Sequence, residues 1–252
     1  SVVGKNAFFD QVGSVTAQLK TSRHSDTPQI DTPHSRRRVS LADYEFADLI
    51  DQQDKVRLLI DPTSSYAQAA AMAMGRAMDD VIIAAATGTA STGETGSGSE
   101  SAQTAIAASV GTGTGLNITK LRTAKQLLDL ADVDPSIPRH IVCGPEQITN
   151  LLGTTEVTSS DFNTIKALVH GEVDSFLGFK FTTSTRLAKS GNDRTVIAFA
   201  QDGITLGIGK DVNARIDERA DKSYATQVYY CMSIGATRME QAKVVPITCT
   251  EA

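Results

Sequence analysis

The stretch DPTSSYAQAAAMAMGRAMDDVIIAAATG, residues 61–88, decides the class of fold. Asp61 can cap a helix whose first position is Pro62, and the apolar residues that follow recur at three- and four-residue spacing. Those residues are Ala67, Ala70, Ala71, Met74, Met78, Val81, Ile82 and Ala85. At about 1.5 Å rise per residue this helix would be roughly 35 Å long, the length of a whole small domain. Gly75 costs such a helix about 1 kcal/mol relative to alanine, so we expect a close packing contact there.

The middle of the chain is predicted to be mainly helical. Residues 88–115 are rich in glycine, serine and threonine, which predicts a loop or flexible hairpin with a short strand at 105–110. A second helix is expected to begin after Asn117 as its cap and to end before Asp134 and Pro135. The further elements predicted here are a buried strand at 139–144, a helix from Pro145 to the closing Gly153, and a short helix at 162–169.

The last third of the chain has the two-residue period of strands. Strands are predicted at 179–182, 195–201, 204–209, 212–217, 226–236 and 242–249, separated by turns that include Gly209-Lys210-Asp211. Within 226–236, one face carries Val228, Tyr230, Met232 and Ile234. Pro246 places its part of the last strand at an edge or a bulge. Because helices and strands are segregated and no βαβ repeat is visible, we predict an α+β fold.

The segment from Ser14 to Ser40 is polar and contains Pro28 and Pro33. Proline lacks a backbone donor, so the centre of this segment is not a sheet interior. The flanks at 15–20 and 37–44 are predicted to be the arms of a long exposed hairpin. Such a hairpin cannot bury much of itself, and we expect it to be stabilised by another part of the structure or by another chain.

Composition limits the classes of protein that fit. A chain of 252 residues can form one large domain or two closely packed smaller ones, and its formal charge of -5 argues against a dedicated nucleic-acid binder. Its three cysteines are widely spaced without a CxxC pair, which favours a reducing compartment and no metal cluster. We find no apolar run of membrane-spanning length and no secretory signal, so a soluble, cytoplasmic protein is expected.

The stretch GTASTGET at 88–95 has the spacing of a phosphate-binding loop, with Glu94 in place of the lysine. A working loop needs that lysine and a preceding strand, whereas a helix is predicted to precede this one. The span 77–119 contains no lysine, arginine or histidine. A nucleotide-binding enzyme using 88–95 is therefore the weakest hypothesis, and the acidic span suggests a surface that avoids DNA.

No other pattern indicates catalysis. The histidines are unpaired in sequence, no GxSxG stretch occurs, and no cysteine has a signature of nucleophilic activation. Asp79 and Asp80 are adjacent in the predicted helix and point about 100° apart, so they do not form an acid and base pair. A solvated flank or an ion pair with Arg76 is the simpler interpretation. We therefore predict no catalytic, cofactor-binding or metal-binding residues and no enzyme activity.

A basic triplet stands directly before an acidic segment. Arg36, Arg37 and Arg38 precede Asp43 and Glu45. A basic stretch followed by an acidic one suits pairing with a neighbouring copy of the chain better than pairing with a polyanion. These five residues are the predicted inter-subunit contacts.

Read in order, the elements resemble the major capsid proteins of tailed double-stranded-DNA bacteriophages, the Hong Kong-97-type shell fold. VTAQLK to VSLADYEF, residues 15–46, resembles the extended loop (E-loop) of that family, and 61–88 resembles its long spine helix. The series at 117–133, 139–152 and 178–187 resembles the helix and strand order of its central domain. The stretch 196–247 resembles the part of that family's chain that leaves the central domain and returns to the spine helix as long strands.

The resemblance implies a division of the chain into three parts. Residues 1–54 would be a remnant of the N-terminal arm and the E-loop, and residues 116–225 the axial (A) domain. Residues 55–115 with 226–252 would form the peripheral (P) domain, which contains the spine helix and the long strands.

The resemblance also implies a structural role. Copies would assemble as hexamers and pentamers into an icosahedral virion capsid, in the host cytoplasm, around packaged double-stranded DNA. Scaffolding, portal and decoration proteins would be partners, contact with DNA would be indirect, and no membrane would be involved. The alternative of the same fold is the shell of a bacterial nanocompartment of the encapsulin type, which encloses an enzyme.

Overall fold

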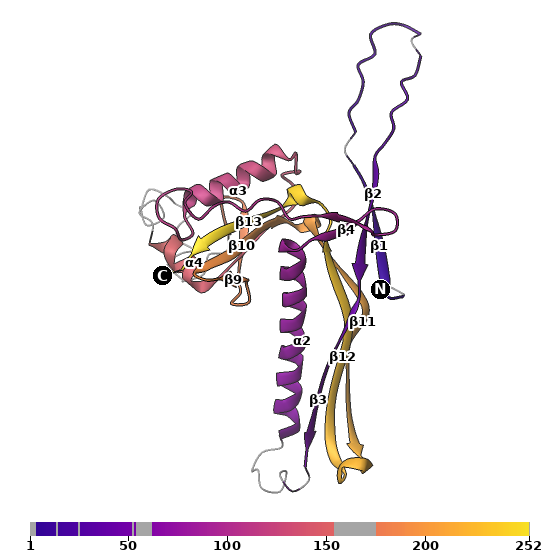
Figure 1. Ribbon diagram of the computed structural model, residues 1–252, viewed down its shortest axis with the longest axis vertical. Helices are drawn as coiled ribbons and strands as arrows, with labels where there is room; N and C mark the ends of the chain where they lie inside the picture. Colours follow the sequence, from indigo (N-terminus) through magenta and orange to yellow (C-terminus); the bar gives the residue numbers. More distant parts are fainter. Residues whose placement is uncertain are drawn as a thin grey trace.

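The computed structural model describes residues 4–153, apart from 14, 25, 52 and 54–61, and residues 175–251. Figure 1 shows a long upright helix beside three long strands, a second layered unit at their upper end, and a loop that projects away from both. The chain combines a few helices with mainly antiparallel sheets, which agrees with the α+β prediction. The predicted cap Asp61 and the predicted helix at 162–169 lie outside the described residues.

Helix α2 (Pro62–Thr87) is the predicted long helix, and it packs against one face of a three-stranded antiparallel sheet. Met74 is buried against Met232 and Ile234, with Tyr230 beside them, so the predicted apolar face of the 226–236 strand is confirmed. The sheet has the order β11-β12-β3. Its strands are β3 (Ala42–Ile50), β11 (Ile204–Arg219) and β12 (Ala225–Arg238).

Strand β11 corrects the sequence prediction of two strands joined by a turn at 209–211. It is one continuous strand, and its register against β12 shifts between Ile208 and Lys210 and again between Lys210 and Asn213. These shifts are β-bulges, which insert extra residues without ending the pairing. The Gly-Lys-Asp sequence is typical of a turn, but a bulge uses the same residues to bend a strand.

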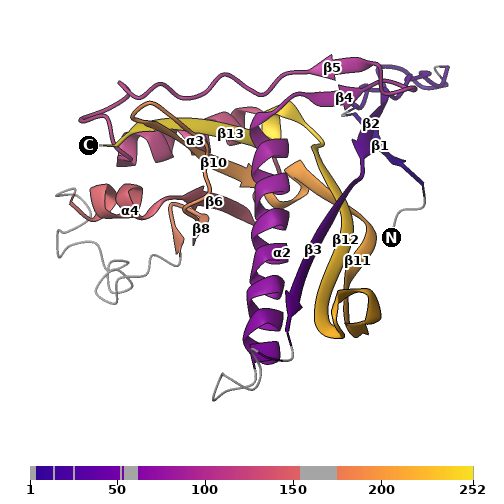
Figure 2. The same cartoon turned by 60° about the horizontal axis from the view of Figure 1, so that its bottom comes forward.

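The second unit is a six-stranded sheet of order β13-β10-β6-β8-β7, with β9 paired to β10. Helices α3 (Ile118–Leu130) and α4 (Pro145–Leu152) belong to this unit (Figure 2). Its pairs are antiparallel except for β6 and β8, which are parallel, a crossover that the sequence did not reveal. The strands are β6 (Arg139–Cys143), β7 (Ser175–Phe176), β8 (Phe179–Thr183), β9 (Lys189–Ser190), β10 (Asp193–Ala200) and β13 (Val244–Thr250).

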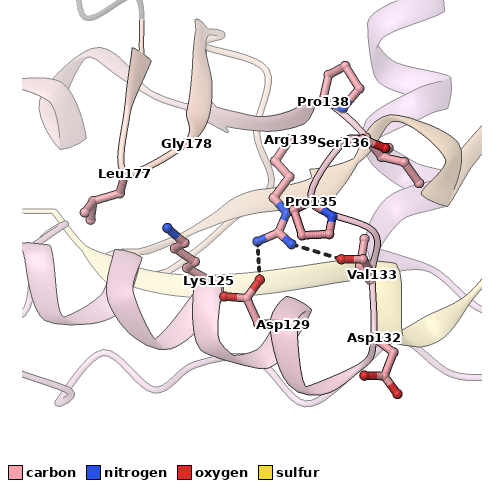
Figure 3. A pocket seen from close by; sticks show the side chains of 11 residues that line it. Lys125, Asp129, Asp132, Val133, Pro135, Ser136, Pro138, Arg139, Leu177 and Gly178 are labelled. Carbon is pink, nitrogen blue, oxygen red and sulfur yellow. Dashed lines mark hydrogen bonds and ion pairs between the residues drawn. The ribbon is translucent and has the colours of Figure 1, made fainter.

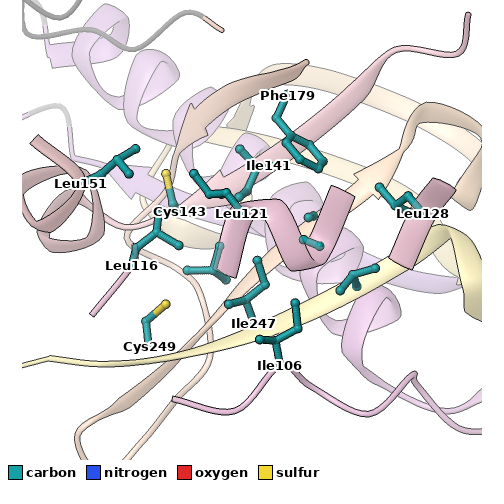
Figure 4. Packing of buried hydrophobic residues seen from close by; sticks show 14 of the residues in the cluster. Ile106, Leu116, Leu121, Leu128, Ile141, Cys143, Leu151, Phe179, Ile247 and Cys249 are labelled. Carbon is teal, nitrogen blue, oxygen red and sulfur yellow. The ribbon is translucent and has the colours of Figure 1, made fainter. Parts of the chain in front are cut away.

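The core of this unit lies between α3 and the sheet (Figure 4). Leu121 and Leu128 of α3 are fully buried against Ile141 and Phe179 of the sheet. The predicted cap is confirmed, because the Asn117 side chain accepts a hydrogen bond of 2.8 Å from the backbone N–H of Lys120. Short 3-10 helices connect the strands at Gln201–Gly203, Ala220–Lys222 and Gln241–Lys243.

A third sheet, of order β1-β2-β4-β5, carries the projecting loop (Figure 1). Its strands are β1 (Asn6–Val12), β2 (His34–Ser40), β4 (Ala90–Thr92) and β5 (Gly98–Glu100). The hairpin arms are therefore β1 and β2, and the predicted first arm at 15–20 is wrong, because those residues form no strand. The Gly13 N–H donates to the Pro33 carbonyl at 2.8 Å and closes the ladder below the loop at 13–33.

The predicted strand at 105–110 is reduced to one bridge. Ile106 pairs in parallel with Ile247 of β13, accepting from the Thr248 N–H and donating to the Pro246 carbonyl, both at 2.9 Å. These contacts lie along the outer edge of β13, the terminal strand of its sheet in the described chain. The prediction that Pro246 lies at an edge is confirmed.

Gly75 does not have the close contact that we expected from its place in α2. A Cβ built at Gly75 meets no atom of the described residues within 4 Å, and Gly75 is exposed. On the same side of α2, the Met72 side chain is 64% exposed. Within the single chain, this side of the helix is uncovered.

The three sheets cut across the predicted domain boundaries. β11 falls in the predicted segment 116–225 but pairs along its length with β12, and β13 falls in 226–252 but pairs with β10. The division into arm, P domain and A domain stays a prediction. If the domains follow the sheets, β11 belongs to the P domain and β13 to the A domain.

Candidate assembly surfaces

The three arginines of the basic triplet occupy different environments on β2, since consecutive strand residues point to opposite faces. Arg36 is partly exposed, forms an ion pair of 2.5 Å with Asp10 on β1, and lies over the Phe8 ring at 5.6 Å. The Asp10 carboxylate raises the pKa of Arg36, chiefly through this hydrogen bond. Arg36 therefore fixes the register of the two arms and keeps part of its surface available.

Arg37 points inward. Its Nη2 donates to both carboxylate oxygens of Glu100 at 2.9 and 2.8 Å, and its Nε donates to the Met239 carbonyl at 2.7 Å. Hydrogen bonds between a guanidinium and a carboxylate are among the stronger polar contacts in proteins. The guanidinium of Arg37 thus joins β2 to β5 and to the end of β12 within its own subunit.

Arg238, which the sequence analysis did not single out, lies fully buried beside this pair. Its Nη1 donates to the carbonyls of Ala86 and Gly88 at 3.1 and 2.8 Å, and its Nη2 donates to the Glu100 carbonyl at 2.8 Å. The last carbonyls of a helix have no partner inside the helix, and α2 has no basic residue in its last turn. Burial lowers the pKa of Arg238, while the Glu100 carboxylate opposes that shift. A residue 150 positions away in sequence therefore caps α2.

Arg38 lies against the β4–β5 turn. Its Nε is buried and has no hydrogen-bond partner among the described residues, and its Cδ would lie 2.6 Å from a Cβ built at Gly96. Gly96 has a φ of 72°, so a side chain at that position would be both strained and obstructed. The aliphatic part of Arg38 thus packs under a turn that requires glycine.

Asp43 and Glu45 lie on the outer face of β3, away from α2. The Tyr229 hydroxyl of β12 donates to Glu45 Oε2 at 3.3 Å. Both acidic residues line a surface depression of about 500 Å³ that also contains Lys210 and Cys231. The structure therefore places the two predicted acidic contacts together, on a different sheet from the basic triplet.

The 88–95 stretch is a β-hairpin. Strands β4 and β5 enclose a turn in which Gly93 and Gly96 have φ values of 88° and 72°. The stretch follows helix α2 and leads into no helix, which is the opposite of the strand-to-helix order of a phosphate-binding loop. Glu94 shares a depression with Asp10 and Arg36. This geometry gives the nucleotide-binding hypothesis no support.

The adjacent aspartates of α2 are also structural. Asp80 forms a bidentate ion pair with Arg186, which lowers the pKa of Asp80 and replaces the partner Arg76 that the sequence suggested. Among the described residues, no three His, Cys, Asp or Glu side chains are grouped as metal ligands. No described helix combines the length and the apolarity needed to cross a membrane.

The depression in Figure 3 lies between the C-terminal end of α3 and the β7–β8 turn. Arg139 extends into it, forming an ion pair of 2.7 Å with Asp129 and donating to the Val133 carbonyl at 3.1 Å. Lys125 and Asp132 stand at its rim. Because Asp129 pairs with the Arg139 charge, the Arg139 guanidinium is not left unpaired to bind a charged ligand in this depression.

A family model described as phage capsid protein matches residues 1–251. The chain belongs to the phage capsid protein family. No curated protein matches the capsid chain in sequence.

Solved capsid structures share its fold. The capsid of Ralstonia phage GP4 has a TM-score of 0.76 at 9% identity, with 99% of this chain and 84% of that chain covered. The acid-stable capsid of Helicobacter pylori bacteriophage KHP30 has a TM-score of 0.74 at 10% identity, covering 99% and 86%. A Mycobacterium phage Che8 structure has a TM-score of 0.69 at 18% identity, covering 97% and 84%.

The predicted fold and role are thereby confirmed at the level of the family. The protein has the Hong Kong-97-like capsid fold and is a structural major capsid protein of the virion. The nanocompartment alternative is not favoured, because the family model and the similar structures are those of phage capsids.

A buried ion cluster of the capsid protein makes its stability depend on pH. Arg194, Lys189 and Gln147 all donate to the Glu251 carboxylate and hold its pKa at about 2, below the ordinary 4.5. A depressed carboxyl pKa stabilises the fold above the unfolded value, and this contribution is lost as the pH falls through the folded value. We expect Glu251→Gln to lower the free energy of unfolding by roughly 2 kcal/mol near neutral pH.

That loss should shrink as the pH falls from 4.5 towards about 2, which urea unfolding of both proteins across this range would measure. Glu218→Gln is the matched control, because Glu218 is exposed on β11. A loss that stays constant across the pH range would show that packing at Glu251, and not its charge, stabilises this region.

Proposed function

We propose that this capsid protein assembles as hexamers and pentamers into an icosahedral shell that encloses double-stranded DNA. The observation that carries the proposal is the loop at 13–33, which extends beyond the rest of the subunit (Figure 1) and has no core of its own. Its apolar side chains face solvent in the single chain, with Leu19 88% exposed and Val15 53% exposed. Apolar side chains gathered on a projecting loop are expected to be covered by another subunit.

A second surface would receive a neighbour. The side of α2 with Met72 and Gly75 is uncovered, and Tyr66 at its beginning is also exposed. We infer that the loop of one subunit covers apolar surface of the next, and that the uncovered side of α2 is part of this surface. A glycine there lets a neighbouring backbone approach closely.

The charged contacts would lie beside these surfaces. Arg36, Asp43 and Glu45 keep exposed polar atoms and remain the proposed inter-subunit contacts, together with the partly exposed Arg38. Arg37 contributes indirectly, because its pairing with Glu100 positions β2. The acidic span 77–119 supports indirect contact with DNA, and the role would be non-enzymatic.

The remaining partners follow from the role. Scaffolding, portal and decoration proteins would bind the assembled shell, no membrane would be involved, and assembly would occur in the host cytoplasm. We assign the arm and E-loop to residues 1–54, the P domain to α2 with strands β11 and β12 of the three-stranded sheet, and the A domain to the six-stranded sheet with α3 and α4.

Negative-stain electron microscopy of the purified protein tests the proposal. Under assembly conditions we expect closed shells or isolated capsomers with fivefold and sixfold symmetry. A protein that stays monomeric across salt, pH and crowding conditions, and is absent from purified virions, would refute it.

A further inference from the structure

The outer face of the three-stranded sheet carries an unusual side-chain pair at its bulges. The register shifts on either side of Lys210 bend β11 and place Lys210 opposite Ser233. Gly209 allows this bend, since a Cβ there would lie 2.6 Å from Leu41 Cδ1. Bulges often re-aim a side chain beside a functional site. Here the result is that Lys210 Nζ donates to Cys231 Sγ at 3.2 Å.

Two further polar side chains complete the cluster. Tyr229 lines the same depression as Cys231, and its interaction with the thiol is the main cause of the raised pKa of Tyr229. The Tyr229 hydroxyl donates to Glu45 Oε2 at 3.3 Å. The thiol thus accepts from an amine, and a phenol and a carboxylate line the same depression.

Cys231 differs from the other two cysteines in its access to solvent. It lines the open depression of about 500 Å³ on this face. Cys143 and Cys249 lie fully buried in the six-stranded unit (Figure 4), where burial raises their pKa values to about 12 and about 11. A soluble oxidant would therefore react first at Cys231.

We propose that Cys231 and Lys210 are a redox modification site, at which a peroxide joins the two side chains through a reversible sulfur–nitrogen bond. In the first step hydrogen peroxide oxidises the thiol to a sulfenic acid and is itself reduced, releasing one water. In the second step the Lys210 ammonium loses a proton to the solvent, and the amine attacks the sulfenic sulfur. The S–N bond forms, the S–O bond breaks, and hydroxide leaves with the second amine proton as water.

The geometry favours this product over the competing ones. Sulfenic acids condense with nearby nitrogen or thiol groups, and a partner held in contact has a large advantage over one in solution. Cys143 and Cys249 are fully buried in the core of the six-stranded unit, so neither faces the depression that holds Cys231.

The linkage would act where the sheet is weakest. The ladder between β11 and β12 is interrupted at the bulges, and beyond them every residue of β11 from Lys210 to Arg219 is exposed. A covalent bond from Lys210 to Cys231 would bridge that interruption. The oxidised subunit would therefore hold the outer half of β11 more firmly than the reduced one.

Intact-mass spectrometry of the purified subunit, treated with a small excess of hydrogen peroxide, tests the proposal. We expect a mass decrease of two hydrogen atoms that dithiothreitol reverses. After digestion, trypsin should no longer cleave behind Lys210, and residues 195–215 should appear joined to residues 223–238. Hydrogen–deuterium exchange of 210–219 should slow on oxidation.

Three variants make the result decisive. Lys210→Arg keeps the charge but removes the amine, so it should stop at a sulfenic acid, with a gain of one oxygen that dimedone traps. Cys231→Ser should show neither change, and Lys222→Arg, an exposed lysine beyond the same strand, should behave like the wild type. If the wild type gains oxygen and is still cleaved behind Lys210, the proposal is wrong.

Discussion

Replacement of residues 14–32 by a short turn is expected to give a folded subunit that no longer forms shells. The Gly13–Pro33 hydrogen bond of 2.8 Å closes the β1–β2 ladder directly below the loop, so the two ends already lie side by side. The described part of the loop contributes no residue to a buried core cluster, so its removal should change the free energy of unfolding little. If the loop covers a neighbour, its loss removes that contact at every copy in the shell, and assembly should fall by at least about tenfold.

The deletion boundaries matter. A cut of residues 22–35 would remove His34 and Ser35 from their pairing with Val12 and Gln11. Light scattering and electron microscopy measure assembly, and thermal unfolding measures the fold. Leu19→Ser should weaken assembly while the matched exposed change Lys20→Ser should not. An unfolded deletion variant would show that the loop is part of the core, and a variant that assembles normally would refute its role.

Arg238→Met is expected to lower the free energy of unfolding by roughly 3–5 kcal/mol. Methionine retains much of the buried volume but leaves the carbonyls of Ala86, Gly88 and Glu100 without their donor. A buried carbonyl that loses its partner costs about 1–3 kcal/mol, and the α2 terminus also loses its only described cationic cap.

Urea denaturation followed by circular dichroism measures this loss. Arg219→Met is the matched control, because Arg219 is exposed and pairs with Asp221 over two residues, so we expect it to unfold like the wild type. Equal stabilities of the two variants would mean that solvent replaces Arg238 at the end of α2.

The elements that the sequence predicts well are those with local signals. The apolar spacing after Pro62 specifies α2, Asn117 specifies the start of α3, and Pro145 with Gly153 brackets α4. Each signal acts within one or two helical turns of the residue that carries it. The alternation of Tyr230 and Met232 predicts a strand with one buried face for the same reason.

The features that the sequence did not predict depend on distant partners. β6 and β8 are parallel neighbours, although 35 residues separate the last of β6 from the first of β8 in the chain. Residues 15–20 have strand-like alternation but no partner, and β-structure is stable only when its backbone groups are paired. Gly209 and Lys210 have turn composition, yet pairing on both sides holds them in a bulge.

The candidate contacts show the same limit. Nothing in the triplet Arg36 to Arg38 distinguishes its members, and only the position of Glu100 and Met239 makes Arg37 internal. Arg238 carries no local signal at all, because the carbonyls it binds belong to the end of a helix early in the chain. The two-residue period of a strand shows which residues share a face. It does not show which of the two faces the fold buries.

The central position of β12 has a consequence for synthesis of the protein. β3 and β11 pair with β12 and not with each other, so the sheet cannot close before residues 225–238 have left the ribosome. Contacts between such distant segments give a high contact order, and folding is slow until the late segment arrives. Until then Met74 of α2 lacks Met232 and Ile234, the buried residues of β12 against which it packs. A prematurely terminated chain without β12 therefore cannot present a finished surface to its neighbours, and only complete subunits can enter a growing shell.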